Sequence, residues 1–573
     1  MPTTLAERRR RLEQQFPEWI ERSLGDWLTF CASTYADRPL VITDDRTTTY
    51  AEIEAWTTRL ADGLVALGVK PGEHVGILMA NYTEFVPLKF AIARAGAVAV
   101  PINFLYRNEE LKYVLEQSQC RLLITMTGYS GMDYLAMLDT IAPGWDSGDP
   151  TLELPLLRRV IQLSTDGQSR DGVLTVQDLD QLGSSNVGVS ADIRPDPQSI
   201  SDILYTSGST GSPKGVLIKH DAAQRTGYAS ALTRAFEDNR RILFSLPCYH
   251  MFGYVEGLIA AMVVGGSVIL QSKFDPADYL RGIEQHRATD ILCVPTMTVA
   301  ILEHPNVTMH DLSTLQAVLC GAAPGPVWLW ERVESVLGAT EIVTGYGMTE
   351  CGGCMTLTLP EDSYDVTAST VGQPKWAGAA GIGACDGALV EYRTVDPVTG
   401  EFLPEGSEGE LVSRGPTSMT GFWDKPAETA NGLRDGWVFS GDLGRVRANG
   451  YLEITGRSKE LYKSGGELVM PKEIEELLSA HPGISQAYAI GVRDDRWGEV
   501  GCACVVRAPG STVTEDEVLA ICKENLARFK VPKLVWFRDA SDLPTTATGK
   551  IQKFRLVQQA TKKLASDRSR QKA

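Results

Sequence analysis

Short apolar runs alternate along the first part of the chain with longer segments in which apolar residues recur every three or four positions. Residues 39–42, 74–79 and 96–101 form such runs and predict strands, whereas the intervening segments 50–67 and 85–95 have helical spacing. Strands that alternate with helices at this interval are typical of βαβ units, which build a parallel sheet. The pattern therefore predicts an α/β fold for this part of the chain.

A second block of the same kind begins after residue 240. Its predicted strands are 241–246, 267–270, 291–295 and 317–319. A helical pattern at 275–286 lies between them, so we expect a second α/β sheet. Between the two blocks, residues 139–196 are rich in Gly, Asp, Ser and Pro, apart from a strand-like run at 159–163, and we interpret them as a looped connector.

The C-terminal part of the chain follows another pattern. From 387 to 452 the apolar runs shorten and glycine-aspartate turns multiply, which predicts a small β-rich subdomain. Beyond residue 457 we expect a compact α+β unit, whose predicted helices and strands are 471–481, 487–492, 501–506 and 514–526. The predicted organisation is a large N-terminal domain, 1–457, with two α/β sheet subdomains and the β-rich subdomain, followed by a small α+β C-terminal domain, 458–573.

Composition and charge narrow the choice of partners. The formal net charge of −17 disfavours a nucleic-acid-binding protein, because phosphate backbones require a basic face. The longest apolar run, 255–270, is interrupted by Glu256 and a Gly-Gly pair, so we expect no stable membrane insertion. The 11 cysteines and an N-terminus without an apolar leader suit a reducing compartment, and we expect a cytoplasmic protein.

A loop dense in hydroxyl groups lies between the strand-like runs 201–204 and 216–218. Residues 205–215 read Tyr-Thr-Ser-Gly-Ser-Thr-Gly-Ser-Pro-Lys-Gly. Glycine lets backbone N–H groups turn inward to attract an anion, and Lys214 adds a positive charge. The GxxxxGK[ST] pattern does not fit, because Gly211 is followed by Ser-Pro-Lys. We interpret the segment as a phosphate-binding loop of another kind; a glycine-serine hairpin that binds nothing is the alternative.

Further candidate chemistry lies in the stretches 345–350 (GYGMTE), 440–444 (SGDLG), 456–466 (GRSKELYKSGG) and 544–550 (PTTATGK). In the first, the Tyr346 ring beside glycine can stack on a purine, Thr349 can donate to a phosphate, and Glu350 can hold a hard cation. Asp442 in the second can accept from a ribose diol. Each stretch alone also fits an ordinary turn, and Lys550 alone fits a solvated lysine.

Taken in this order, the motifs resemble those of the adenylate-forming superfamily, which contains acyl-CoA synthetases, peptide-synthetase adenylation domains and luciferases. The resemblance extends roughly from residue 25 to residue 560. The segments 529–532 (FKVP) and 548–553 (TGKIQK) look most like the acyl-CoA synthetase branch. This resemblance implies an AMP-forming acid–thiol ligase. A carboxylic acid and ATP give acyl-AMP and pyrophosphate, and a thiol then displaces AMP.

The resemblance also implies roles for individual residues. The residues expected to bind the triphosphate are Thr206, Ser207, Gly208, Ser209, Thr210, Gly211 and Lys214. The residues expected to enclose adenine are those of the turn Gly321, Ala322 and Ala323, together with Tyr346 and Gly347. Asp442 and Arg457 are expected to bind the ribose. Thr349 is expected to contact the α-phosphate, Glu350 to carry Mg²⁺, and Lys550 to bridge the acyl carboxylate and the α-phosphate.

Members of the superfamily move the small domain between the two half-reactions, and the hinge falls here at Lys459. For CoA, the resemblance points to Gly465 and Gly466 in the pantetheine channel and to Lys463 and Lys530 near the phosphates. His250 is expected beside the substrate carboxylate, and the other expected acyl-pocket residues are Tyr254, Cys320, Thr344 and Gly345. Many fatty-acyl relatives carry Asn-Ile where this chain has Leu468-Val469, so the acid, from fatty-acid or secondary metabolism, stays open.

Several alternatives remain at this point. We expect CoA as the acceptor, because no carrier domain follows the lysine loop; a carrier protein acting in trans is the alternative. Two further alternatives concern the activity itself. One is an enzyme that runs only one half-reaction, and the other is a non-enzymatic acyl-nucleotide-binding protein. The CxxC pair Cys351 and Cys354 has no second pair at zinc spacing and directly follows Glu350, so we expect neither a metal site there nor a redox cofactor.

Overall fold

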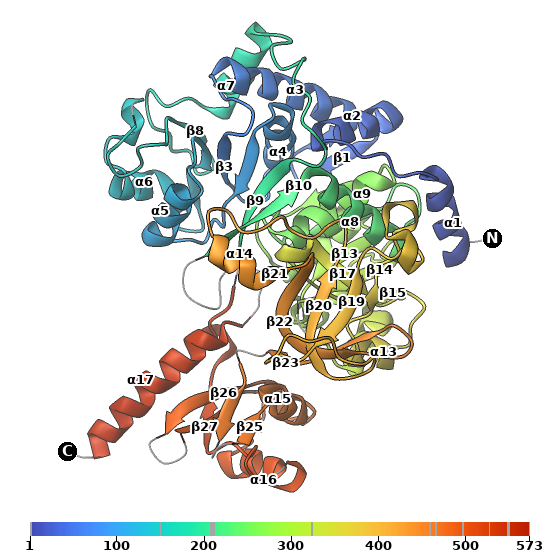
Figure 1. The fold of residues 1–573 in the computed structure, drawn as a ribbon, viewed down its shortest axis with the longest axis vertical. Coiled ribbons are helices and arrows are strands. Elements are labelled where there is room, and N and C mark those ends of the chain that lie inside the picture. Colours follow the sequence, from blue (N-terminus) through green and yellow to red (C-terminus); the bar gives the residue numbers. More distant parts are fainter. Residues whose placement is uncertain are drawn as a thin grey trace. The chain divides into compact units, whose positions relative to one another are not determined.

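The computed structural model describes residues 3–148, 150–206, 213–322, 325–457, 460–464, 467–494, 498–526, 528–546 and 551–571 (Figure 1). Their contacts divide the chain into two compact units. Unit 1 contains Met1–Tyr392 and Ser413–Phe439, and unit 2 contains Arg393–Val412 and Ser440–Ala573. Each unit has its own core. Among the described helices, none combines the length and the apolar composition needed to cross a lipid bilayer.

The first sheet of unit 1 has six strands in the order β10-β9-β4-β3-β5-β8. Their bounds are β3 His74–Leu78, β4 Val98–Pro101, β5 Leu122–Met126, β8 Arg159–Leu163, β9 Ile200–Thr206 and β10 Lys214–Lys219. All neighbours are parallel except β9 and β10, which form an antiparallel pair. The helices α3 (Tyr50–Ala66), α4 (Phe85–Arg94) and α5 (Asn108–Gln117) alternate with these strands. The predicted α/β pattern is thus confirmed.

The second sheet has seven strands in the order β15-β14-β13-β11-β12-β1-β2. Their bounds are β1 Pro39–Ile42, β2 Thr47–Thr49, β11 Arg241–Phe244, β12 Ser267–Leu270, β13 Asp290–Cys293, β14 Ala317–Cys320 and β15 Glu341–Val343. Only β1 and β2 pair antiparallel. The run at 39–42 is therefore a strand as predicted, but it pairs with β12 of the second block, Val41 opposite Val268.

The segment interpreted as a looped connector contains a helix that the prediction missed. Helix α7 spans Val176–Ser185. Thr175 caps it, with its Oγ1 accepting from the Asp178 N–H at 3.0 Å, while the Asp178 carboxylate accepts from the Thr175 N–H at 2.8 Å. This reciprocal capping box supplies partners for backbone groups that a helix end leaves unpaired. Leu179 is fully buried, so an apolar face anchors a helix whose composition is otherwise polar.

Short antiparallel strands dominate the rest of the predicted large domain. In unit 1, β16 (Gly345–Met348) pairs with β17 (Gly353–Leu357), and β17 with β18 (Gln373–Pro374). Residues 391–457 contain β19 Glu391–Val395, β20 Gly409–Arg414, β21 Leu433–Arg434, β22 Trp437–Val446 and β23 Leu452–Arg457. Strand β22 is antiparallel to both β21 and β23. The predicted β-rich segment is therefore confirmed.

The C-terminal part of unit 2 is an α+β sandwich. Its strands are β24 Tyr462–Ser464, β25 Glu467–Val469, β26 Ile484–Asp494, β27 Gly498–Arg507 and β28 Leu534–Phe537. Its helices are α15 Pro471–Ser479, α16 Glu515–Asn525 and α17 Lys553–Gln571. Alternate side chains of a strand point to opposite faces of its sheet. Accordingly Ala503 and Val505 of β27 join the cluster with α15 and α16, whereas Cys502 and Cys504 join the cluster with α17.

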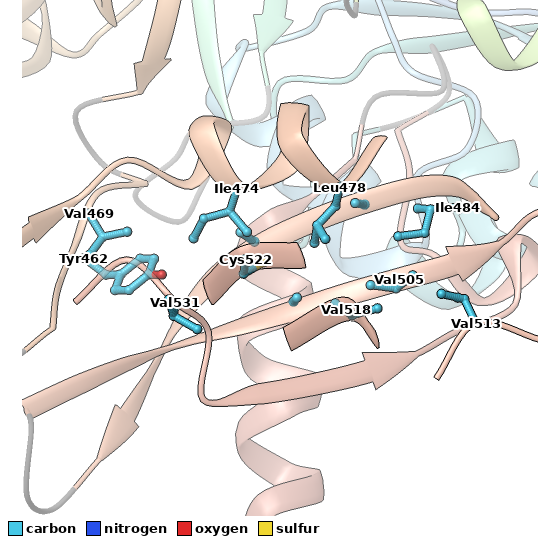
Figure 2. Packing of buried hydrophobic residues seen from close by; sticks show 13 residues of the cluster. Tyr462, Val469, Ile474, Leu478, Ile484, Val505, Val513, Val518, Cys522 and Val531 are labelled. Carbon is cyan, nitrogen blue, oxygen red and sulfur yellow. The ribbon is translucent and has the colours of Figure 1, made fainter. Parts of the chain in front are cut away.

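Figure 2 shows the first of these clusters, in which side chains from the two helices and the sheet point toward one another. Ile474 and Leu478 of α15 and Val518 and Cys522 of α16 are each at most 1% exposed. They meet Val505 of β27 in the same cluster. Complete removal of such side chains from water is the main contribution to folding. This part of unit 2 therefore has an apolar core that does not depend on unit 1.

Candidate functional site

The two ends of the predicted phosphate loop are held by the β9–β10 pair. Thr206 and Lys214 lie directly opposite each other at its open end. The Trp423 N–H donates to the Gly215 carbonyl at 2.7 Å, and Lys214 Nζ lies 5.0 Å from the centroid of the Phe422 ring. Five predicted phosphate contacts, Ser207, Gly208, Ser209, Thr210 and Gly211, lie outside the described residues. Thr206 and Lys214 thus flank the loop as the motif predicts.

The GYGMTE stretch forms a hairpin in which glycine is required by a close backbone approach. A Cβ at Gly345 would lie 2.3 Å from the Thr356 carbonyl oxygen, and one at Gly347 would lie 2.0 Å from the Gly353 carbonyl oxygen. The Tyr346 ring between them stands 6.4 Å from the Tyr392 ring, centroid to centroid. Packing in the hairpin therefore accounts for Gly345 and Gly347, and the predicted place of Gly345 in the acyl pocket stays a prediction.

The residues that follow this hairpin strand are fixed by the next turn. Thr349 opens the short helical turn η5 (Thr349–Cys351) and is 7% exposed. The Glu350 carbonyl accepts from the Met419 N–H at 2.8 Å, which fixes the backbone that carries the predicted Mg²⁺ carboxylate. The neighbouring thiols have separate partners, since Cys351 Sγ lies 3.2 Å from Ser413 Oγ and Cys354 Sγ donates to the Thr356 carbonyl at 3.1 Å. Neither cysteine belongs to a disulfide or to a metal-binding cluster within the described part of the chain.

The predicted adenine turn and acyl wall meet at the carboxyl ends of two neighbouring parallel strands. Strands β14 and β15 are paired so that Leu319 lies opposite Val343. The next residues along the chain, Cys320 at the end of β14 and Thr344 directly after β15, therefore lie side by side. Ligands of open α/β sheets bind at such carboxyl ends. Both residues are at most 5% exposed. The structure thus brings together two sets of residues that the motifs placed in one site.

The turn after β14 has an unusual backbone. Ala322 has a φ of 68°, in the left-handed region that residues with a side chain rarely adopt, and Ala323 lies outside the described residues. A Cβ at Gly321 would lie 3.3 Å from the Phe252 ring and 4.0 Å from the Gly345 carbonyl oxygen. The turn therefore packs against both the 250–254 segment and the start of the GYGMTE hairpin.

His250 precedes a π-helical segment, η2 (Phe252–Ile259). Its Nδ1 accepts from the Phe252 N–H at 3.2 Å, and its carbonyl accepts from the Tyr254 N–H at 3.0 Å. Widened turns of this kind occur frequently at functional sites. Because the Phe252 ring lies against Gly321, His250 belongs to the same region as the adenine turn.

Tyr254, predicted for the acyl pocket, points into the interior. It is 1% exposed, its ring centroid lies 4.8 Å from Lys89 Nζ, and burial raises the pKa of its hydroxyl well above the usual value. Lys89 forms an ion pair of 2.7 Å with Asp202 on β9, four residues before Thr206. The ring therefore packs beside a buried charge pair that includes a residue of β9, the strand that leads into the phosphate loop. Its predicted contact with the acyl group stays a prediction.

In unit 2, the predicted ribose residues are cross-strand neighbours. Asp442 on β22 lies opposite Arg457 on β23. Asp442 is 4% exposed, and its N–H donates to Ser440 Oγ at 3.0 Å. The Gly441 N–H donates to Glu410 Oε1 at 2.9 Å. The SGDLG turn is thus held from both sides, which fixes the backbone that carries Asp442.

The predicted residues of the mobile domain are only partly described. Lys459, Gly465, Gly466 and Lys550 lie outside the described residues. The backbone of Lys463 pairs with that of Leu468 in the β24–β25 hairpin. Lys530, predicted near the CoA phosphates, pairs with the Glu473 carboxylate of α15. Its ammonium is thus held in the fold by an acidic partner.

Buried charges of unit 1 were missing from the predicted set. Lys375 Nζ lies 2.5 Å from Glu256 Oε1, and both side chains are 0% exposed. Ser230 Oγ donates to the other Glu256 oxygen at 2.5 Å. Glu256 lies on η2, the segment that follows His250. The available signal was this single carboxylate inside an apolar run, because a fully buried charge requires a partner.

The fold and this arrangement of residues define an ATP-dependent ligase that works through an acyl-adenylate. Residues 28–423 match the model of the AMP-binding enzymes, and residues 473–550 match the model of the AMP-binding enzyme C-terminal domain. The chain therefore belongs to the AMP-binding enzyme family. The predicted superfamily, its acyl-CoA synthetase branch and the enzyme class are thereby confirmed.

Individual relatives agree with this class. The chain is 34% identical to a putative acyl-CoA synthetase, YngI, of Bacillus subtilis, over 94% of this chain and 97% of the relative. It is 34% identical to a feruloyl-CoA synthase of Amycolatopsis, over 93% and 98%. The solved structure of the anthranilate CoA ligase AuaEII with anthranoyl-AMP superposes with a TM-score of 0.81 at 26% identity, over 96% of this chain and 99% of that one. ATP-bound MatB from Rhodopseudomonas palustris gives 0.79 at 28% identity, over 94% and 99%.

Proposed function

We propose that this acyl-CoA ligase runs both half-reactions itself, with Mg²⁺ as the activating ion and CoA as the acceptor. In the first, a carboxylate oxygen attacks the α-phosphorus of ATP and pyrophosphate leaves. In the second, the thiol sulfur attacks the acyl carbonyl, loses its proton and expels AMP. The observation that carries the proposal is the meeting of the predicted adenine turn and acyl wall at the ends of β14 and β15. Both reactants of the first step would then lie at one sheet edge.

The phosphate loop supplies the groups that receive the triphosphate. Thr206 and Lys214 face each other across the β9–β10 pair, so a hydroxyl and an ammonium flank the loop. Lys214 leans on the Phe422 ring, which holds the long side chain in one region. Backbone amides of a glycine-rich loop attract phosphate oxygens. The β- and γ-phosphates would be held here while the α-phosphate reaches Thr349.

The residues present fit Mg²⁺ of the kind that travels with a nucleotide. The described residues contain no cluster of three or more His, Cys, Asp or Glu side chains suited to a metal. Mg²⁺ in such enzymes is usually held by one or two carboxylates together with substrate phosphates. Glu350 is the candidate carboxylate. Bound there, the ion would neutralise phosphate charge.

Two anions must approach each other in the first half-reaction, so a positive charge at the reacting centre should dominate catalysis. Lys550 is the proposed source, bridging the acyl carboxylate and the α-phosphate. Asp442 and Arg457 would hold the ribose hydroxyls, and their cross-strand pairing is consistent with a shared ligand. His250 would lie beside the acyl carboxylate.

The acceptor is proposed as CoA, with Gly465 and Gly466 beside the pantetheine arm because residues without side chains leave room. A swing of the small domain about Lys459 would withdraw Lys550 and bring these glycines in. A carrier protein that presents the same pantetheine thiol is the second candidate. The names of two reported relatives are those of a feruloyl-CoA synthase and an anthranilate CoA ligase, which favours free CoA.

The experiment is a panel of acids assayed for pyrophosphate exchange and, with CoA, for thioester formation by mass spectrometry. The panel begins with ferulate and anthranilate, the acids of two named relatives, and includes medium-chain fatty acids. We expect Lys550→Ala to lower exchange about a hundred- to a thousandfold, the range for one positioned charge contact, and to spare thioester formation from supplied acyl-AMP.

The outcomes separate the candidates. Pyrophosphate exchange without thioester formation from CoA would favour a carrier protein as acceptor or an enzyme that only adenylates. Thioester formation confined to supplied acyl-AMP would favour an enzyme that runs only the second half-reaction. Binding of acyl-AMP with no turnover would indicate a binding protein. Equal loss of both half-reactions in Lys550→Ala would reject the role of that lysine.

A further inference from the structure

A three-part ion cluster in unit 2 joins segments that are far apart in the sequence. Lys553 Nζ lies 2.6 Å from Glu460 Oε2 and 2.8 Å from Glu475 Oε1. Glu475 Oε1 also accepts from the Ala489 N–H of β26 at 2.8 Å. The side chains of Lys553, Glu460 and Glu475 are 16%, 30% and 17% exposed. The cluster thus ties the first residue of α17 to α15 and to the turn before β24.

The residues of the cluster lie next to two predicted functional positions in the sequence. Glu460 directly follows the proposed hinge residue Lys459, and Lys553 comes three residues after Lys550. The described residues on either side of the lysine loop are themselves joined, because Thr545 bridges Ile551 and the Gln552 N–H donates to the Pro544 carbonyl at 2.8 Å. Lys553 therefore anchors the base of the loop to the residue that leaves the hinge.

The lysine is charged at neutral pH in this setting. Burial lowers the pKa of Lys553, but the carboxylates of Glu475 and Glu460 outweigh burial and leave that pKa above its usual value. Burial raises the pKa of Glu475, which Lys553 and the Ala489 N–H oppose. Lys553 thus supplies a positive charge to both carboxylates, and Glu475 has the Ala489 N–H as a further partner. Loss of the Lys553 ammonium would break the link between Glu460 and the base of the lysine loop.

Apolar packing already attaches α17 to the sheet. Leu556 and Ala560 are 0% and 2% exposed and pack in the cluster that contains Cys502 and Cys504 of β27. Replacement of a partly buried ion pair by apolar groups is often neutral for stability, so such pairs are better explained by the geometry that they select. Leu543 and Ile551, on either side of the lysine loop, pack against the same cluster, so apolar contacts hold the loop base to the sheet. The ion cluster adds the link from this base to Glu460.

We propose that Lys553 is a positioning residue for Lys550: through Glu460 and Glu475 it holds the base of the lysine loop to the segment that follows the hinge. A rotation at Lys459 then carries the loop with it in a fixed orientation. The proposal rests on the proposed role of Lys550 in adenylation. It assigns Lys553 no contact with substrate.

The test uses the full-length enzyme and four variants: Lys553→Met, Lys553→Arg, Lys550→Ala and the Lys550→Ala/Lys553→Met double variant. A displacement of about 1 Å at a reacting group can cost about a hundredfold in rate. We expect Lys553→Met to lower kcat of pyrophosphate exchange about 10- to 100-fold, with the KM values for ATP and acid and the rate of thioester formation from supplied acyl-AMP largely unchanged. Lys553→Arg should recover most of the loss, because it restores the charge.

The double variant separates positioning from a general structural effect. If Lys553 acts through Lys550, Lys553→Met causes no further loss in the Lys550→Ala background, because the group that it positions is gone. A loss of similar size in both backgrounds would overturn the proposal. So would a parallel fall of both half-reactions together with a lower unfolding temperature, which is the signature of a damaged unit 2.

A milder variant guards against misfolding. Glu460→Gln removes only the negative charge of the hinge-side contact and leaves the Lys553–Glu475 pair in place. We expect the same selective loss of exchange, smaller in size, and unchanged exchange would contradict the proposal. Exchange in the wild type that responds to Lys550→Ala but not to Lys553→Met would overturn this inference alone. Absence of exchange with every acid would overturn it together with the proposed function.

Discussion

The two units hold their buried charges in different ways. In unit 1, Lys375 and Glu256 form an ion pair of 2.5 Å with both side chains 0% exposed. In unit 2, Lys553 and its partners Glu460 and Glu475 keep between 16% and 30% of their side-chain surface exposed. Glu256 of the first pair belongs to η2, in the 250–259 segment of unit 1. The second lies beside the proposed hinge.

This difference teaches how rigid each region has to be. A fully buried charge that loses its partner has no water to replace it, so any rearrangement is costly. A partly exposed charge can exchange its partner for water at little cost. Loss of a partner should therefore cost more folding free energy in the Lys375–Glu256 pair of unit 1 than in a partly exposed pair of unit 2.

The largest expected effect is removal of the buried lysine of unit 1. Lys375→Met should lower the free energy of unfolding by about 3–5 kcal/mol, because Glu256 is left buried and unpaired. Urea denaturation of the wild type and the variant measures the difference. The double variant Lys375→Met/Glu256→Gln should recover part of the loss, and an effect below about 1 kcal/mol in the single variant would erase the contrast between the units.

A second effect, of intermediate size, concerns a neutral histidine in unit 1. His220 opens α8 (His220–Thr233), is 1% exposed, and accepts from the Leu24 N–H through Nδ1 at 3.2 Å. Burial lowers its pKa to about 4 from 6.5, despite the opposing charge of Asp202. The unfolded chain binds this proton more tightly. The contribution to stability is therefore complete above about pH 6.5 and falls as the pH drops toward 4.

We expect this histidine to account for about 2 kcal/mol of lost stability between about pH 7 and about pH 5. His220→Asn removes the titrating group, so its unfolding free energy should change less over that interval. Urea midpoints at the two pH values provide the measurement. Identical pH slopes for the two proteins would show that the histidine is not held neutral.

The smallest expected effect lies in unit 2, at the pair of Lys530 and Glu473. Their side chains are 25% and 35% exposed, so solvent screens the charges. Glu473→Gln should change the free energy of unfolding by about 0–1 kcal/mol in the same urea experiment. A loss as large as that of Lys375→Met would mean that unit 2 is as intolerant of charge removal as unit 1.

Local pattern was enough to predict most of the fold. The alternation of short apolar runs with helical spacing identified the strands of both α/β blocks, because each buried strand and each amphipathic helix has its own period. The strand that pairs with β1 could not be predicted from the sequence. Val41 pairs with Val268, and neither short apolar run contains a signal that identifies the other as its partner. Helix α7 was missed because its polar composition outweighed the Thr175–Asp178 capping box.

The candidate site was predicted less completely than the fold. The motifs assigned Cys320 and Thr344 to one acyl pocket, and the pairing of β14 with β15 brings the two residues side by side, but their contact with an acyl group stays a prediction. The same motifs do not name the charge partners of Lys375, Glu256 or Lys553, because those partners lie on other elements. Charge pairs of this kind are selected by three-dimensional packing, so they appear only once the elements are assembled.

The distribution of thiols has a practical consequence for following domain movement by fluorescence. All cysteines except Cys354 and Cys385 are buried. Burial raises the pKa of Cys354 to about 12, so its sulfur stays protonated and unreactive. Cys385, at the end of the short turn η7 (Gly383–Cys385), is then the natural attachment point for a maleimide dye on unit 1. A second dye on a cysteine engineered into the surface of unit 2 would report the proposed swing of the small domain as a change of energy transfer.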